Sequence, residues 1–232
     1  MVTTLIEGDK RGGFQRLPRP LRIGIEWVLT IGVAVLVVLA LKEWVVNPYR
    51  IPSASMEPTL HCARPAGGCE AGSSDRVLAN RFIYHLRRPH RGEIVVFNAP
   101  AGACGTGGTF VKRLIGLPGD RLQEKNGRWF VNGKRLDDSY VQPARRDNGS
   151  GFYSIPQGRY FFLGDNRSES CDSRVWGPVP RSRLIGPVFA TYWPLNRISA
   201  STPGPAGAGI LAALVGALIL FFVLVRRRRK PS

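Results

Sequence analysis

The chain has 232 residues, which suits one medium-sized domain with accessory segments and is long enough to bury a core. Hydrophobic residues make up 44% of the sequence but are unevenly distributed, and the formal net charge is +17. A basic chain can indicate nucleic-acid binding, but residues 1–22 contribute +3 and residues 226–232 contribute +5, and the remaining surplus is scattered among acids. No nucleic-acid-binding motif is present, so nucleic acid is not an expected partner. The charge instead indicates membrane topology and attraction to an anionic lipid bilayer.

Two apolar segments lie near the ends of the chain. Residues 23–41 are apolar except for Glu26, and residues 209–225 carry no charge. About 20 helical residues cross the hydrocarbon core of a bilayer, so each segment is predicted to be a transmembrane helix rather than a buried core helix. The first segment could alternatively belong to a cleaved signal peptide. Its length and the lack of a small-residue cleavage site directly after it favour an uncleaved anchor.

Basic residues flank both apolar segments on the side of the chain termini. Residues 1–22 contain five Lys or Arg, and residues 226–232 form a basic tail. By the positive-inside rule, both termini are predicted to be cytoplasmic in a two-pass protein of the cell membrane. The region between the two spans is therefore expected outside the cytoplasm, as a domain over residues 48–195 followed by a flexible linker over residues 196–208.

The external region contains short apolar runs separated by turn signals. Six runs rich in Val, Ile, Phe, Tyr and Trp are predicted to be strands: 76–79, 93–97, 110–115, 128–131, 160–163 and 188–193. Asn126-Gly127 and Asn132-Gly133 are two-residue turn signals on either side of the fourth run, so a β-meander is expected there. No amphipathic helical pattern alternates with these runs, which predicts an all-β domain. Residues 143–151 are expected to form an exposed loop.

All four cysteines, Cys62, Cys69, Cys104 and Cys171, fall in the region placed outside, where disulfides can persist. Cys62 and Cys69 bracket a turn-rich loop, so a local disulfide between them is predicted. Four cysteines allow three pairings, and proximity in the sequence favours this one without fixing the choice. A zinc site is not expected, because the pair lacks C-x-x-C spacing and no second such pair accompanies it.

Ser55 lies in the run Pro52–Leu60, a few residues past the first apolar segment, where a nucleophile would meet substrates held near a bilayer. A serine hydroxyl needs a positioned base to take its proton. The three histidines, His61, His85 and His90, do not lie in runs that are built around them, and the G-x-S-x-G elbow is absent. A Ser-His-Asp triad is therefore disfavoured.

Lysine is the other available base. Lys112 lies on a predicted strand, and by period-2 alternation it shares a face with Phe110 and Leu114 while Arg113 takes the other face. Burial disfavours the charged form of a lysine and lowers its pKa, which makes it a usable base. Alternation alone leaves two readings open, a buried lysine or a surface lysine on an edge strand.

Four segments resemble, in the same order, the conserved boxes of bacterial type I signal peptidases. The segments are Ser53–Leu60, Asp75–Val77, Lys112–Asp120 and Gly164–Arg174. The resemblance covers roughly Tyr49 to Tyr192 and implies an antiparallel β fold of the signal-peptidase type. It also implies a Ser-Lys endopeptidase that removes signal peptides from exported preproteins, without a metal or cofactor.

Carried over position by position, the resemblance implies Ser55 as the nucleophile and Lys112 as the general base. Ser53 would donate its hydroxyl to the oxyanion beside the backbone N–H of Ser55, and Ser170 would orient Lys112. Such a dyad requires Ser55 Oγ and Lys112 Nζ to lie within hydrogen-bond reach in the folded protein.

The resemblance further implies that Asp172 and Arg174 form an ion pair that supports the Gly164–Arg174 segment. The family's Gly-Asp-Arg is Ser-Asp-Arg here, with Ser74 in the place of glycine. Cys171, directly after Ser170, is a second departure, and it is expected either to join Cys104 in a disulfide or to be a buried free thiol.

The expected partners are preprotein signal peptides, the lipid bilayer and, nearby, the secretion translocon. An extended preprotein segment would add beside the site as a strand, with small residues selected at its −1 and −3 positions. Three rival classes remain: a Ser-Lys peptidase of another type, a pilin- or spore-specific processing enzyme of the same fold, and a membrane-tethered β domain without activity. The rival without activity would have no reason to keep Ser55, Lys112 and Ser170 together.

Overall fold

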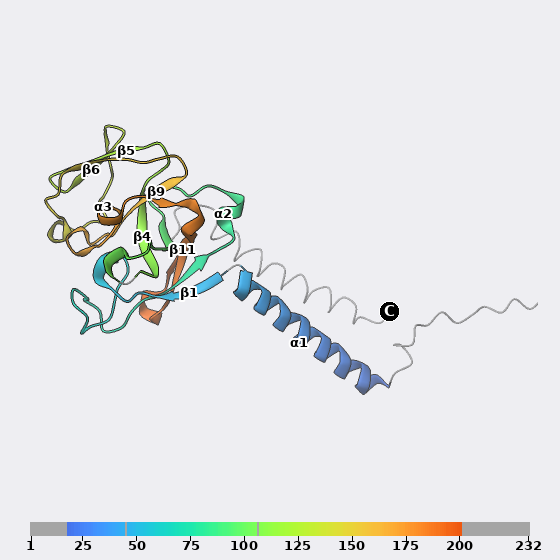
Figure 1. The fold of residues 1–232 in the computed structure, drawn as a ribbon. Coiled ribbons are helices and arrows are strands. Elements are labelled where there is room, and N and C mark those ends of the chain that lie inside the picture. Colours follow the sequence, from blue (N-terminus) through green and yellow to red (C-terminus); the bar gives the residue numbers. More distant parts are fainter. Residues whose placement is uncertain (1–17, 45, 106, 201–232) are drawn as a thin grey trace, which may run out of the picture. The chain divides into compact units, whose positions relative to one another are not determined.

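The computed structural model describes residues 18–44, 46–105 and 107–200 (Figure 1). The chain divides into two compact units, Met1–Val45 and Val46–Ser232. Of the predicted flexible linker 196–208, residues 196–200 instead form the end of a 3₁₀ turn (Leu195–Arg197) and a short paired strand (Ser199–Ala200). The rest of the linker, the apolar segment 209–225 and the basic tail 226–232 lie outside the described residues, as do most of residues 1–22.

In the first unit, helix α1 (Arg19–Trp44) contains the apolar segment 23–41. Taking length and hydropathy together, none of the helices in the described ranges qualifies as a span of a lipid bilayer. The prediction of a transmembrane helix at 23–41 is therefore not confirmed.

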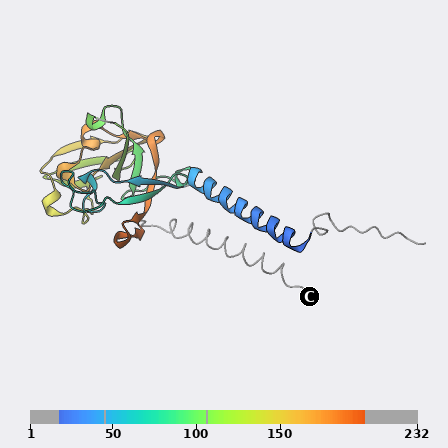
Figure 2. The ribbon, with the colours of Figure 1, turned by 90° about the horizontal axis from the view of Figure 1, so that it is seen from below.

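The second unit is predominantly β, as the sequence predicts. Its larger sheet has the order β1-β2-β11-β3-β4-β9-β10, with β12 paired to β11, and all of its pairings are antiparallel. The strands are β1 (Val46–Arg50), β2 (Arg76–Asn80), β3 (Ile94–Asn98), β4 (Thr109–Gly116), β9 (Arg159–Leu163), β10 (Val179–Pro180), β11 (Leu184–Trp193) and β12 (Ser199–Ala200). The late strand β11, orange in Figures 1 and 2, lies between the early strands β2 and β3, so the two ends of the domain meet in one sheet.

A second, smaller antiparallel sheet is inserted between β4 and β9, with the order β7-β6-β5-β8. Its strands are β5 (Arg121–Lys125), β6 (Arg128–Val131), β7 (Lys134–Arg135) and β8 (Gly151–Ser154). Asn126 and Asn132 have positive φ angles of 50° and 52°, and each is followed by a glycine that also has a positive φ. Two consecutive residues with positive φ are what a tight hairpin turn requires, so the predicted meander around β6 is confirmed.

Short helical turns connect the strands. The α-helical turns are α2 (Ile83–Leu86) and α3 (Ser173–Trp176), and the 3₁₀ turns are η2 (Ala54–Met56), η3 (Ala103–Gly105), η4 (Pro143–Arg145), η5 (Arg167–Glu169), η6 (Arg181–Arg183) and η7 (Leu195–Arg197). The six predicted strands are confirmed as β2, β3, β4, β6, β9 and β11. Most of the predicted exposed loop 143–151 is formed by η4 and the irregular chain that leads into β8.

Candidate active site

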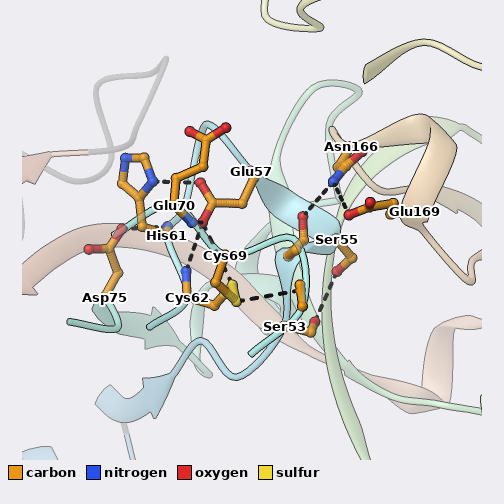
Figure 3. The surroundings of a disulfide bond; sticks show 12 residues. Ser53, Ser55, Glu57, His61, Cys62, Cys69, Glu70, Asp75, Asn166 and Glu169 are labelled. Atoms are coloured by element: carbon orange, nitrogen blue, oxygen red, sulfur yellow. Dashed lines mark hydrogen bonds and ion pairs between the residues drawn. A yellow bond between two sulfur atoms is a disulfide. The ribbon is translucent and has the colours of Figure 1, made fainter. Parts of the chain in front are cut away.

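The turn η2 presents Ser55 between β1 and β2. Its two flanking residues, Ala54 and Met56, are buried in the apolar core together with Ile51 and Leu60. These contacts fix the backbone of the turn from both sides. Ser55 itself is 8% exposed, and its Oγ lies 3.3 Å from the Oγ of the more exposed Ser53 (Figure 3).

Asn166, in the loop after β9, holds the same turn from the opposite side. Its backbone N–H donates to the carbonyl of Ser55 over 3.1 Å, and its side-chain Nδ2 donates to the carbonyl of Ala54 over 3.1 Å. The same Nδ2 donates to the carboxylate of Glu169 (Figure 3). Asn166 is completely buried. Sequence reasoning placed this residue in a conserved-looking box but assigned it no role, because its partners lie more than a hundred residues away in the chain.

The backbone N–H of Ser55 makes no hydrogen bond among the described residues. It is the second residue of a 3₁₀ turn, and the first N–H groups of a helical turn have no acceptor within the turn itself. This N–H and the hydroxyl of Ser53, which lies 3.3 Å from Ser55 Oγ, are therefore two donors available close to the serine hydroxyl. Such a pair can stabilise a negative oxygen that develops beside the serine.

Lys112 lies on β4, which is paired with β3 on one side and β9 on the other. The residue is 4% exposed, so its side chain lies in the interior of the domain rather than on an edge strand. Burial lowers the pKa of Lys112 to about 8, against a smaller opposing effect of the Asp172 carboxylate. With this pKa, roughly a tenth of the lysine is neutral at pH 7 and about half at pH 8, and the neutral amine is the form that can accept a proton.

Ser170 is bonded to the lysine and lies close to the serine turn. Lys112 Nζ donates a 3.0 Å hydrogen bond to Ser170 Oγ. No hydrogen bond joins Lys112 Nζ directly to Ser55 Oγ among the described residues, although η2 and β4 are neighbours. A β-carbon added to Gly164 would lie 2.2 Å from Ser170 Oγ and 2.4 Å from the Ser55 carbonyl oxygen, so Ser170 and the serine turn face each other across this glycine.

An ion pair supports the loop that carries Ser170. Arg174 Nε and Nη2 each donate to the carboxylate of Asp172 over 2.8 Å, and Nη2 also donates to the carbonyls of Arg167 and Ser170 over 2.8 and 3.3 Å. The buried Asp172 accepts a further hydrogen bond from the N–H of Gly164 over 3.1 Å. The two residues therefore join the start and the end of the loop.

The four cysteines form two disulfides, Cys62–Cys69 and Cys104–Cys171. The first closes the turn-rich loop that the sequence indicated (Figure 3). The second settles the question that the sequence left open for Cys171: it is not a free thiol but is bonded to the loop between β3 and β4.

Glu57, His61 and Glu70 form the one group among the described residues with the spacing of metal ligands, since their ligand atoms lie within 4.8 Å of one another (Figure 3). Protein donors already occupy much of this group. Glu57 Oε2 lies 2.5 Å from His61 Nδ1, Glu57 Oε1 accepts from the N–H groups of Cys62 and Glu70, and Glu70 pairs with Arg145. His61 is thus bonded to Glu57 rather than to Ser55, and the other two histidines are exposed.

A serine on a fixed turn, two donors beside its hydroxyl and a buried lysine of lowered pKa can together perform the chemistry of a serine hydrolase whose base is lysine. Residues 24–193 match the family model described as "Signal peptidase, peptidase S26". The chain therefore belongs to the signal peptidase family, peptidase S26, a family of serine endopeptidases.

Several curated proteins are similar over most of their length. A "Probable signal peptidase I-2" of Synechocystis sp. is 40% identical over 75% of this chain and 75% of its own length. A "Signal peptidase I" of Leptolyngbya laminosa is 36% identical over 78% and 86%, and a "Signal peptidase I P" of Bacillus subtilis subsp. natto is 33% identical over 75% and 91%. A crystal structure of a signal peptidase I from Enterococcus faecalis covers 44% of this chain and 97% of its own chain at 30% identity, with a TM-score of 0.38, which is too low to establish a shared fold.

Proposed function

We propose that this protein cleaves N-terminal signal peptides from exported preproteins with Ser55 as nucleophile and Lys112 as general base, through an acyl-enzyme. The observation that carries the proposal is the burial of Lys112, with its lowered pKa and its hydrogen bond to Ser170, beside the turn that holds Ser55. Membership of the signal peptidase family supplies the reaction and the class of substrate.

In the first half of the reaction, neutral Lys112 takes the proton of Ser55 as the serine oxygen attacks the scissile carbonyl carbon. The negative oxygen of the tetrahedral intermediate would accept from the hydroxyl of Ser53 and the N–H of Ser55. A donor in such a position typically contributes about 3–4 kcal/mol to transition-state stabilisation. When the intermediate collapses, the protonated lysine returns the proton to the leaving amine, which is the new N-terminus of the mature protein.

In the second half, the same lysine accepts a proton from water, and the resulting hydroxide attacks the ester carbonyl at Ser55. Collapse releases the signal peptide as a carboxylate and returns the proton to Ser55. Ser170 and the Asp172–Arg174 pair act as supports: Ser170 keeps Lys112 Nζ in place, and the ion pair keeps Ser170 in place.

The proposal includes a location at the cell membrane, with the β domain on the extracytoplasmic side and substrates arriving near the secretion translocon. Its support is the charge distribution of the sequence and the many large apolar side chains that α1 exposes, such as Trp27, Val28 and Leu36. Fractionation of expressing cells tests it. Release of the protein from the membrane fraction by alkaline carbonate would contradict integral insertion, and protease digestion of the β domain from the cytoplasmic side would contradict the orientation.

The central experiment incubates the purified full-length protein with a preprotein and sequences the new N-terminus of the product. Cleavage at a single site after a small residue is expected, and Ser55→Ala and Lys112→Met should abolish it while circular dichroism stays unchanged. Wild-type activity should rise through a pH of about 8 as Lys112 loses its proton. Normal cleavage by either variant refutes the dyad.

A further inference from the structure

The Cys104–Cys171 disulfide joins the two segments that carry the proposed base and the residue bonded to it. Cys104 lies in the loop between β3 and β4, eight residues before Lys112, and Cys171 directly follows Ser170. Bonded cysteines are separated here by 67 residues of sequence. The cross-link and the Lys112–Ser170 hydrogen bond therefore connect the same two parts of the fold.

The loop on the Cys104 side has little intrinsic rigidity. Residues 99–108 contain several glycines with positive φ, and Cys104 itself has a φ of 53°, which is uncommon for a residue with a side chain. The hydrogen bonds within this loop are local, such as that from the Ala103 N–H to the Pro100 carbonyl. At the base of the loop, Arg183 Nη1 donates a 2.7 Å hydrogen bond to the Ala99 carbonyl. Among the described residues at its tip, the long-range bond is the disulfide of Cys104.

The loop on the Ser170 side is firmly held at its ends and at the buried Arg167, but has few backbone hydrogen bonds at Ser170 and Cys171. Asn166 and Asp172, at its two ends, are completely buried and bonded to the domain. Between them, neither the N–H of Ser170 nor that of Cys171 makes a hydrogen bond among the described residues, and the Ser170 carbonyl accepts only the long 3.3 Å bond from Arg174. The covalent bond at Cys171 therefore acts next to a residue, Ser170, whose backbone makes few hydrogen bonds.

We propose that the Cys104–Cys171 disulfide is a positioning element of the reaction, which holds Ser170 Oγ against Lys112 Nζ and makes catalysis depend on the oxidised state of this pair. The inference rests on the proposed function of Lys112 as general base. Cys104 is exposed, so a reductant in solution can reach the bond. A dithiol would be oxidised to its own disulfide and give two electrons and two protons to the pair, leaving one thiol on each cysteine.

Loss of the cross-link has a specific chemical consequence. Without it, Ser170 can move away from Lys112, and water can reach the amine that is now 4% exposed. Hydration favours the charged ammonium, so the pKa of Lys112 would rise toward its ordinary value. The activity should then fall most at neutral pH and recover in part at alkaline pH, a pattern that a general loss of stability does not produce.

The test compares Cys104→Ser/Cys171→Ser with Cys62→Ser/Cys69→Ser in the full-length protein. The second double variant is the matched control, because it also removes a disulfide of the same domain but one that has no bond to the Ser170 loop. For the first variant we expect kcat at pH 8 to fall about tenfold, KM to change little, and the midpoint of the kcat–pH profile to move up by about one unit. The control should keep the wild-type midpoint.

A double-mutant cycle with Ser170→Ala separates positioning from a general effect. If the disulfide acts through Ser170, its removal in the Ser170→Ala background should cost little further activity. Should the cysteine variant fail to fold, the folded Cys62→Ser/Cys69→Ser protein can be reduced with dithiothreitol and alkylated, with mass spectrometry confirming the modification of Cys104 and Cys171. Its kcat–pH profile then gives the same test.

An unchanged midpoint after loss of the Cys104–Cys171 bond, or additive effects in the cycle, overturns the inference and leaves the disulfide a purely structural bond. That result would leave the proposed function intact. Cleavage by Ser55→Ala or Lys112→Met would instead refute the proposed function, so the two failures are distinguishable.

Discussion

Replacing Lys112 by Met should make the protein inactive and, at neutral pH, more stable. The substitution keeps an unbranched side chain of similar length but removes an amine that is 4% exposed. Burial lowers the pKa of Lys112 from 10.5 to about 8, so the folded protein binds this proton less tightly than the unfolded chain does. The native state therefore loses stability whenever the unfolded lysine is protonated.

The size and sign of this effect follow from the pKa difference. One pKa unit corresponds to about 1.4 kcal/mol, so the shift costs the wild type about 3 kcal/mol of unfolding free energy at pH values below 8. The penalty disappears as the pH rises from about 8 to 10.5, because the unfolded lysine then also loses its proton. Lys112→Met removes this penalty but also loses the hydrogen bond to Ser170, which costs about 1 kcal/mol of unfolding free energy. The variant should therefore be more stable than the wild type by about 2 kcal/mol at pH 7.

Urea unfolding of the two full-length proteins, followed by tryptophan fluorescence in the same detergent at pH 7 and pH 10.5, measures the difference. The stability advantage of Lys112→Met should be present at pH 7 and absent at pH 10.5. Lys125→Met is the control, since Lys125 is an exposed lysine of the same domain and should show no such pH dependence. A Lys112→Met variant that is less stable than the wild type at pH 7, or an advantage that is constant with pH, would refute the reasoning.

Three further substitutions test the supports of the site. In Gly164→Ala, the new β-carbon would lie 2.2 Å from Ser170 Oγ and 2.4 Å from the Ser55 carbonyl oxygen. Ser170 must therefore move, and cleavage should fall by about 100-fold while the fold is retained. A kcat close to that of the wild type would contradict this prediction. Asp165 is buried and accepts from Arg113 Nε and Nη2 and from Thr59 Oγ1, at 2.8, 2.6 and 2.6 Å. Asp165→Asn removes the negative charge and replaces one acceptor oxygen by an NH₂ donor, so it should destabilise the protein by about 3 kcal/mol in urea unfolding. A loss below about 1 kcal/mol would show that the ion pair is dispensable. Burial and the neighbouring Asp147 raise the pKa of Glu124 from 4.5 to about 7, so the folded state binds this proton more tightly and wild-type stability should fall as the pH rises between these values. Glu124→Gln removes that loss, so its melting temperature relative to the wild type should increase from pH 5 to pH 8, whereas a difference independent of pH would speak against the shifted carboxyl.

The strands that the sequence predicted are those with apolar, β-branched or aromatic side chains on buried faces. Strand β5, with the sequence RLQEK, escaped prediction because three of its five residues are charged, and only Leu122 and Glu124 face the interior. Strand β1 contains Pro48, which local patterns treat as a strand breaker. It is tolerated there because β1 is an edge strand that pairs only with β2.

The burial of Lys112 could not be decided from alternation, because the pattern of β4 is the same for a central strand and an edge strand. What decides it is the pairing with β3 and β9, a tertiary property that no window of sequence contains. The Cys104–Cys171 pairing has the same origin, since four cysteines leave three connectivities until the loops are brought together. The hydrogen bonds from Asn166 to the serine turn likewise join residues that are more than a hundred positions apart in the sequence.

The resting arrangement of the site separates what is fixed from what is free. The backbone of the serine turn is held by the buried Ala54 and Met56 and by Asn166. Within the part of the chain that the structure describes, the Ser55 hydroxyl has one long contact of 3.3 Å, to Ser53. Lys112 is held by the shorter bond to Ser170. Under the proposed mechanism, the serine hydroxyl would therefore be the group that turns toward a stationary lysine when substrate arrives, because breaking its single weak contact costs less than moving the buried amine. Under this mechanism a fixed Ser170, and with it the Cys104–Cys171 bond, would matter more for activity than the resting contact of the Ser55 hydroxyl with Ser53.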